Sequence, residues 1–132
     1  MGTRQKVVLC DTNVILEFFK GDPKITEELK EIQRKNVRIS VVTSMEIIYG
    51  SLNKQELKEL LKKMGVIETI QITPEISQLA NNLMIDYSLS HDLDLSDSLI
   101  AATALLKNIE LYTLNLKHFR YIPDLKLYQP VQ

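Results

Sequence analysis

The chain is poor in cysteine and glycine, and each shortage excludes a class of protein. Its single cysteine, Cys10, leaves no partner for an internal disulfide and too few thiolates for a zinc site of the cysteine and histidine type. Because Cys10 ends an apolar run, we expect it to be a small buried core residue. The four glycines form neither of the glycine-rich fingerprints of dinucleotide-binding and P-loop proteins, so both classes are excluded.

Long apolar runs and a surplus of one charge are also missing. No stretch approaches the ~20 apolar residues of a membrane span, and the amino-terminal segment lacks the apolar core of a signal peptide. Sixteen basic residues against seventeen acidic ones give a formal charge of −1, which does not indicate a general nucleic-acid coat. We therefore expect a soluble, cytoplasmic protein with no membrane association.

The chain does have enough apolar residues for one core. Hydrophobic residues make up 45% of the 132 positions, so we expect a single domain at 1–132. Short β-rich runs predict strands at 6–10, 37–42, 66–72 and 109–113, with a fifth at 125–128. Helical patterns lie between them at 13–20, 25–35, 43–52, 54–64, 74–90 and 96–106. This alternation predicts a three-layer α/β/α fold with a mostly parallel sheet of four to five strands.

Four polar residues follow predicted strands or open predicted helices, namely Asp11, Glu46, Asp97 and Asn115. In a parallel sheet the carboxyl ends of the strands share one edge, so residues placed there converge. Converging carboxylates repel one another and raise each other's pKa values unless a cation joins them. Oxygen ligands of this kind suit Mg²⁺ or Mn²⁺, which serve phosphoryl chemistry. The pattern therefore predicts a metal-dependent phosphodiesterase.

Each of these acids also has a purely local interpretation. Asp11 is a good N-cap for the helix that follows it. Thr43 and Glu46 have the spacing of a capping box, and Asp97 suits the dipole at the start of its helix. Both interpretations stay open, because a residue that starts a helix after a strand also lies where the crevice forms. Other polar residues nearby are interpreted as solvated surface residues, namely His91, Asp92, Asp94 and His118.

Basic side chains gather in two places. One set recurs at helical spacing at Lys54, Lys58, Lys62 and Lys63, and a second lies toward the carboxyl terminus at Lys107, Lys117, His118 and Arg120. Lysines at helical spacing usually form a solvated helix face, and this is our first interpretation. Contact with the phosphates of a nucleic acid is the alternative.

Four segments of the chain resemble the PIN-domain ribonucleases of the VapC-like toxin type. They are Asp11 to Asn13, Glu46 to Gly50, Asp97 to Ala104 and Thr113 to Phe119, in that order. The resemblance covers nearly the whole chain. It implies a Mg²⁺- or Mn²⁺-dependent endoribonuclease that acts on an RNA substrate, is usually inhibited by a cognate antitoxin protein and is usually a homodimer.

By their positions in these segments, Asp11, Glu46 and Asp97 match the acidic metal-binding residues of the family. The resemblance also implies a supporting polar role for Thr12. Asn115 falls where many members have a fourth acid and others have asparagine, which removes one negative charge. In the implied mechanism Asp11 and Asp97 hold the cation, while Glu46 orients or deprotonates the water that attacks an RNA phosphodiester. The expected products carry 5′-phosphate and 3′-hydroxyl ends.

Two other functions fit parts of the pattern. A phosphoacceptor signalling domain would need an acceptor aspartate after the third strand, but that strand ends at Gln71, Ile72 and Thr73. A non-catalytic module that keeps the fold and binds a protein or RNA partner stays open, because Asn115 does not supply a fourth charge.

The two short helices after the first two strands carry more bulky apolar residues than one core face needs. Together with the resemblance, this predicts a peptide partner that covers the apolar residues and sends a basic side chain toward the acids. The residues concerned are Phe18, Phe19, Ile48, Tyr49 and Leu52. The alternative is that they complete the core or a homodimer contact.

Overall fold

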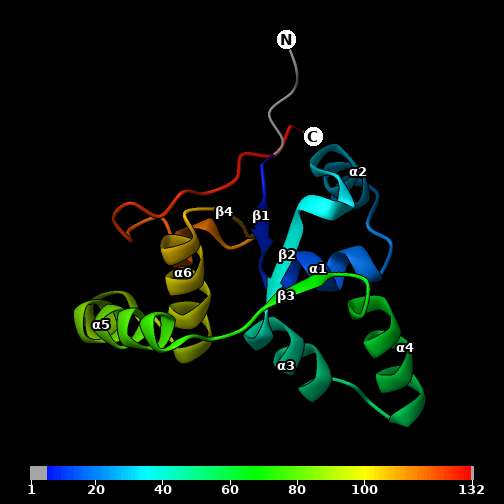
Figure 1. Ribbon diagram of the computed structural model, residues 1–132, viewed down its shortest axis with the longest axis horizontal. Helices are drawn as coiled ribbons and strands as arrows, with labels where there is room; N and C mark the ends of the chain where they lie inside the picture. Colours follow the sequence, from blue (N-terminus) through cyan, green and yellow to red (C-terminus); the bar gives the residue numbers. More distant parts are fainter. Residues whose placement is uncertain (1–5, 132) are drawn as a thin grey trace.

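Four short strands form one sheet in which every neighbouring pair is parallel. The computed structural model describes residues 6–131, and within them the strands are β1 (Val8–Cys10), β2 (Val37–Ser40), β3 (Glu68–Ile70) and β4 (Glu110–Tyr112). Their order is β3-β2-β1-β4 (Figure 1). Because all four run the same way, their carboxyl ends meet at one edge, which is the lower edge of the sheet in Figure 1.

Helices cover both faces of this sheet. They are α1 (Thr12–Phe19), α2 (Pro23–Ile32), α3 (Val41–Tyr49), α4 (Lys54–Met64), α5 (Pro74–His91) and α6 (Leu95–Lys107), with short 3₁₀ turns at η1 (Arg34–Asn36) and η2 (Leu116–His118). The pair α5 and α6 packs on one face, while α1 and α2 pack on the other (Figure 1). Within residues 6–131, every helix is too short or too polar to cross a membrane.

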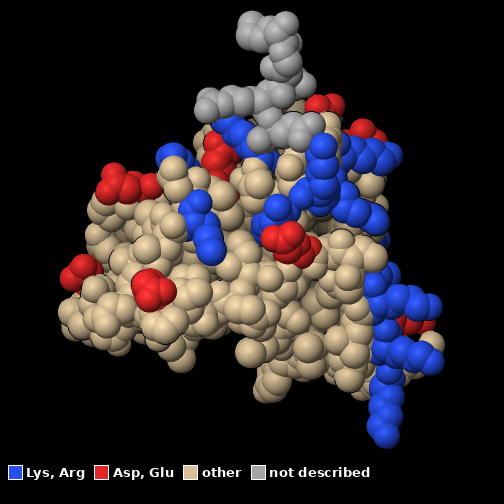
Figure 2. All heavy atoms as spheres, in the orientation of Figure 1, with Lys and Arg blue, Asp and Glu red and all other residues tan. Residues whose placement is uncertain are grey.

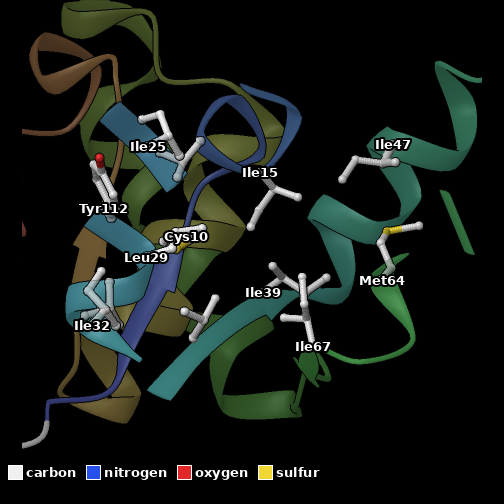
Figure 3. Packing of buried hydrophobic residues seen from close by; sticks show 13 residues of the cluster. Cys10, Ile15, Ile25, Leu29, Ile32, Ile39, Ile47, Met64, Ile67 and Tyr112 are labelled. Carbon is white, nitrogen blue, oxygen red and sulfur yellow. The ribbon is translucent and has the colours of Figure 1, made fainter. Parts of the chain in front are cut away.

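The alternation of side chains along β1 divides the core in two. Val8 and Cys10 point toward α1 and α2 and pack in a cluster with Ile15 (Figure 3). Leu9 points to the other face and packs in a cluster with Ile100 of α6. The predicted three-layer α/β/α fold is therefore confirmed, as is the burial of Cys10, which raises the pKa of its thiol.

The alanine-rich stretch of α6 is buried, as the sequence predicted. Ala101 and Ala102 are fully covered and Ala104 is nearly so. Small side chains let a helix approach its neighbours closely, so α6 is fixed against α5 and the sheet. This packing holds the first turn of α6 at the carboxyl-end edge of the strands.

The boundary between β2 and α3 differs from the prediction. The strand ends at Ser40, whose Oγ accepts a hydrogen bond from the N–H of Val42 at 3.0 Å and so caps α3. The predicted capping box between Thr43 and Glu46 is therefore wrong, because both residues lie inside the helix. Gly50, expected within this helix, instead forms its C-cap.

The predicted fifth strand is reduced to a single bridge. Leu111 and Leu127 pair in parallel, and the backbone of Leu111 exchanges two hydrogen bonds of 2.8 Å with Lys126 and Tyr128. The hydroxyl of Tyr128 then donates to the buried carboxylate of Glu28 in α2 at 2.6 Å. The segment is thus anchored beside β4, and the described sheet has four strands, the lower end of the predicted range.

Candidate active site

Asp11 follows β1 and is held through both of its carboxylate oxygens. Oδ1 accepts the backbone N–H of Thr12 at 2.8 Å, which makes Asp11 the N-cap of α1. Oδ2 accepts the hydroxyl of Thr113, just beyond β4, at 2.8 Å. The residue is only 5% exposed. The predicted capping role is confirmed, and it coexists with a position at the edge where the strands end.

Thr12 connects Asp11 to the acid of α3. Its hydroxyl donates to Oε1 of Glu46 at 2.6 Å and lies 3.0 Å from the hydroxyl of Thr43, which is completely buried. Glu46 itself is exposed. The supporting residue of the sequence analysis therefore aligns a carboxylate from a different helix.

Asp97 lies in the first turn of α6, beside two residues that were interpreted as solvated surface. Oδ1 of Asp94 accepts the N–H of Asp97 at 2.9 Å, so Asp94 is the N-cap of the helix. Nδ1 of His118 lies 3.6 Å from Oδ2 of Asp97. Asp94 and His118 are indeed exposed, but both also belong to the site.

The acids influence one another electrostatically. Burial raises the pKa of Asp97 to about 7, and the negative charges of Asp94, Asp11 and Glu46 act in the same direction, against the opposing effect of His118. Burial also raises the pKa of Asp11, against the hydrogen bonds from Thr113 and Thr12. Four carboxylates from three separate parts of the chain therefore share one small region, as the sequence predicted for three of them.

Asn115 lies at the margin of this region. Its backbone N–H donates to the hydroxyl of Thr113 at 3.0 Å, so it helps to orient the residue that holds Asp11. Its side chain is exposed, and among residues 6–131 it makes no hydrogen bond to the acids. Asn13 fixes the same turn by accepting the N–H of Leu114 at 3.2 Å.

Sequence reasoning missed three contributors, namely Asp94, Thr113 and His118. Asp94 stands three residues before Asp97, which is the spacing of an N-cap, so a signal was present. Nothing in the sequence signals that the hydroxyl of Thr113 reaches Asp11, because the two residues are joined only by the pairing of β1 with β4.

The donor set fits a hard divalent cation by its chemistry. Mutually repelling carboxylates, of which Asp11 is buried and Asp97 partly buried, favour the arrival of positive charge, and oxygen ligands suit Mg²⁺ or Mn²⁺. Within residues 6–131, however, no three His, Cys, Asp or Glu side chains are already gathered closely enough to enclose an ion. The arrangement is therefore an open, acidic site rather than a closed cage.

A groove of about 420 Å³ runs from Glu46 between α1, α3 and α4. Phe19 and Leu52 line it, and Tyr49 lies nearby on α3 with its side chain 93% exposed. Leu52 is 84% exposed, whereas Phe18 packs partly against the core. The apolar residues predicted to meet a partner are thus divided between this groove, the surface of α3 and the core.

Lysines cover the outer side of α4, as Figure 2 shows at its lower right. The side chains concerned are those of Lys54, Lys58, Lys62 and Lys63, all exposed. The predicted exposure of this helix face is confirmed, and contact with phosphates stays an alternative prediction. Lys63 also donates a hydrogen bond of 3.4 Å to the carbonyl oxygen of Phe19, which ties α4 to α1.

Comparison with known proteins gives a consistent result. The PIN domain family matches residues 8–124. Ribonuclease VapC1 of Methanocaldococcus jannaschii is 35% identical, over 92% of this chain and 86% of the relative. Ribonuclease VapC10 of Mycobacterium tuberculosis is 30% identical, over 91% of each chain.

Solved structures agree with the sequence relatives. A toxin-antitoxin complex from Klebsiella pneumoniae contains a chain with a TM-score of 0.78 and 27% identity, covering 95% of this chain and 98% of that one. VapBC-1 from nontypeable Haemophilus influenzae gives a TM-score of 0.77 and 25% identity, covering 96% and 99%. With its parallel α/β/α fold, its converging acids and these relatives, the chain belongs to the PIN domain family and, within it, to the VapC ribonucleases.

Proposed function

We propose that the protein is a Mg²⁺- or Mn²⁺-dependent endoribonuclease and acts as the toxin of a toxin-antitoxin pair. The observation that carries this proposal is the convergence of four carboxylates at the carboxyl ends of the strands, where burial and mutual repulsion raise the pKa of Asp97 to about 7. Such a site is destabilised without positive charge, and it suits phosphodiester hydrolysis. We propose the cytoplasm as the place of this activity, since cellular RNA is its substrate.

Asp11 and Asp97 would hold the cation together with Glu46, and once bound it supplies positive charge to the phosphoryl oxygens and the leaving 3′-oxygen. The hydroxyls of Thr113 and Thr12 hold the carboxylates of Asp11 and Glu46 in place. Thr12 donates to Oε1 of Glu46, and Oε2, which accepts no hydrogen bond among the described residues, would orient the attacking water and accept its proton.

The bond changes balance without a covalent enzyme intermediate. The water oxygen bonds to phosphorus and the bond from phosphorus to the 3′-oxygen breaks. The leaving oxygen takes a proton from solvent to end as a hydroxyl, and Glu46 returns the proton of the water to solvent. The products carry 5′-phosphate and 3′-hydroxyl ends.

The test is cleavage of mixed RNA by purified protein with a chelator and after addition of Mn²⁺ or Mg²⁺. Cleavage should disappear with the chelator and return with the metal. Asp11→Asn and Asp97→Asn should each lose about 100-fold or more in rate, while the matched variant Asp86→Asn, an exposed carboxylate on α5, should cleave like wild type. RNA binding without cleavage in any metal would instead favour a non-catalytic binding module.

We also propose that a cognate antitoxin occupies the groove that ends at Glu46. Support comes from the apolar lining by Phe19 and Leu52, from the exposed ring of Tyr49, and from solved relatives that are toxin-antitoxin complexes. An arginine of the partner would pair with the carboxylates bidentately and take the place of the cation, which explains inhibition by charge replacement.

A homodimer is the remaining part of the proposal. Exposed apolar side chains on α3 and α5 support it, notably those of Met45, Ile85 and Leu89. Light scattering of the purified protein at several concentrations tests the oligomeric state.

A further inference from the structure

Three aromatic rings gather at the carboxyl end of α5. His91, the last residue of the helix, stacks on Tyr121 with ring centroids 4.0 Å apart and planes 18° apart. Tyr87 meets both rings at steeper angles, 5.7 Å from His91 and 5.1 Å from Tyr121. His91 is exposed and Tyr121 partly buried, so the imidazole is the outer ring of the stack.

This aromatic stack adjoins the acidic site. Tyr121 stands three residues after His118, whose ring lies 3.6 Å from Asp97. Phe119 and Ile122 are buried on the α5 and α6 face, and they fix the segment that carries Tyr121. In agreement, the pKa of Tyr121 is raised by burial and by the charges of Asp97 and Asp94.

Tyr121 contributes its ring and not a hydrogen bond to the fold. Its hydroxyl is buried and, among the residues that the structure describes, has no hydrogen-bond partner. A buried hydroxyl without a partner is unfavourable for folding, so the hydroxyl does not account for the placement of this ring. The imidazole of His91, in contrast, is oriented by a 2.8 Å contact between its Nδ1 and the hydroxyl of Ser90.

The imidazole of His91 is a planar ring at the surface beside the acidic site, and an unpaired base of a nucleic acid is a ligand that suits it. Unpaired bases stack on exposed aromatic side chains, whereas bases within a duplex are already stacked on their neighbours. Exposed basic side chains of Lys117 and Arg120 flank the same segment and suit the phosphates on either side of such a base.

We propose that His91, backed by Tyr121, is a stacking platform for an unpaired base of the RNA substrate, next to the phosphate that is cleaved. The inference rests on the proposed ribonuclease function and adds that the substrate is single-stranded at this point. Stacking fixes one nucleotide relative to the acids, so it contributes to where the chain is cut.

The first experiment measures binding of a labelled single-stranded RNA in chelator, where no cleavage occurs. His91→Ala should weaken binding by about 5- to 100-fold, and His91→Phe, which restores a ring, should recover most of it. Tyr121→Phe should keep the stack with His91, because it retains the ring and the hydroxyl has no hydrogen-bond partner among the described residues. Asn82→Ala, at an exposed position on the same helix, is the matched control, and melting temperatures verify folding.

The second experiment separates stacking from a merely structural role. RNAs that each lack one base near the cleavage position are tested with wild type and His91→Ala. For one of these abasic RNAs, the affinity of wild type should be as low as the affinity of His91→Ala for intact RNA. His91→Ala should not lower the affinity for that abasic RNA any further.

The proposed stacking would be contradicted if His91→Ala bound RNA as tightly as wild type does. It would also be contradicted if His91→Ala weakened the binding of every abasic RNA by the same factor. In that case metal-dependent cleavage by the wild-type protein would still stand. Failure of the wild-type protein to cleave RNA in any metal would instead overturn the proposed function, and the platform with it.

Discussion

Asp11 shows how one residue serves both the fold and the site. One carboxylate oxygen caps α1 through Thr12 and the other is held by Thr113, so the side chain is fixed before any ligand arrives. Both bonds stabilise the ionised form, yet burial still raises the pKa. The local hydrogen bonds therefore offset only part of the cost of placing a charge at this edge.

The pKa of Asp97 predicts how stability depends on pH in the metal-free protein. The pKa is raised from 3.8 to about 7, so between these values the folded state holds a proton that the unfolded state has released. Stability contributed by this group is therefore lost as pH rises through that window. In chelator, the stability of wild type relative to Asp97→Asn should fall from about pH 5 to about pH 8.

Urea unfolding of both proteins at the two pH values measures this difference, with Asp86→Asn as the control that should follow wild type. A constant difference between wild type and Asp97→Asn across the window would contradict the raised pKa. Adding Mn²⁺ at the higher pH should restore the stability of wild type more than that of Asp97→Asn.

Single residues could be predicted from the sequence where the signal was local. Asp11, Glu46 and Asp97 follow from the rule that strand ends converge, and Thr12 from the family resemblance. Thr113 and His118 could not be predicted, because their partners Asp11 and Asp97 come close only through the pairing of strands and the path of η2.

Among the elements, the start of α5 was predictable and the start of α3 was not. Thr73 accepts the N–H of Ile76 at 3.2 Å and Pro74 occupies the first turn, as the sequence indicates. At α3 the β-branched pair Val41 and Val42 favours a strand by propensity, but tertiary packing places both in the helix. The cap therefore falls on Ser40, one turn earlier than expected.

This boundary yields a contrast between two alanine substitutions. Ser40→Ala removes the observed cap and should lower the free energy of unfolding by about 1 kcal/mol. Glu46→Ala loses the hydrogen bond from Thr12, but it places a strong helix former at an exposed position and removes a repelling charge. These effects offset one another, so stability without metal should be nearly unchanged. Urea unfolding in chelator compares them. A larger loss of unfolding free energy in Glu46→Ala than in Ser40→Ala would contradict the cap at Ser40 and favour the capping box between Thr43 and Glu46.

At the scale of the whole molecule, the parallel order β3-β2-β1-β4 brings the acids to one edge and directs the groove between α1, α3 and α4 toward them. The sequence predicted the layers and the common edge. It did not predict which apolar residues stay exposed, because Phe18 and Tyr49 belong to equally apolar segments yet only Tyr49 is left outside the core.

The exposed part of the groove predicts the effect of charge on partner binding. Tyr49→Glu and Leu52→Glu alter side chains that are 93% and 84% exposed, so both variants should fold normally. Each should abolish co-purification with the co-expressed cognate antitoxin and relieve inhibition of RNA cleavage. Val131→Glu, at a position that is 74% exposed and outside the groove, is the control. Persistent co-purification and inhibition in both folded variants would place the partner elsewhere.

The central claim is that Asp11 after β1, Glu46 of α3 and Asp97 of α6 act together on a divalent cation. Calorimetric titration of metal-free protein with Mn²⁺ at about pH 8 tests it most directly. The account predicts saturable binding by wild type and Asp86→Asn, weakened about 10-fold or more in Asp11→Asn and Asp97→Asn. The same isotherm for all four proteins, or no binding by wild type, would contradict it.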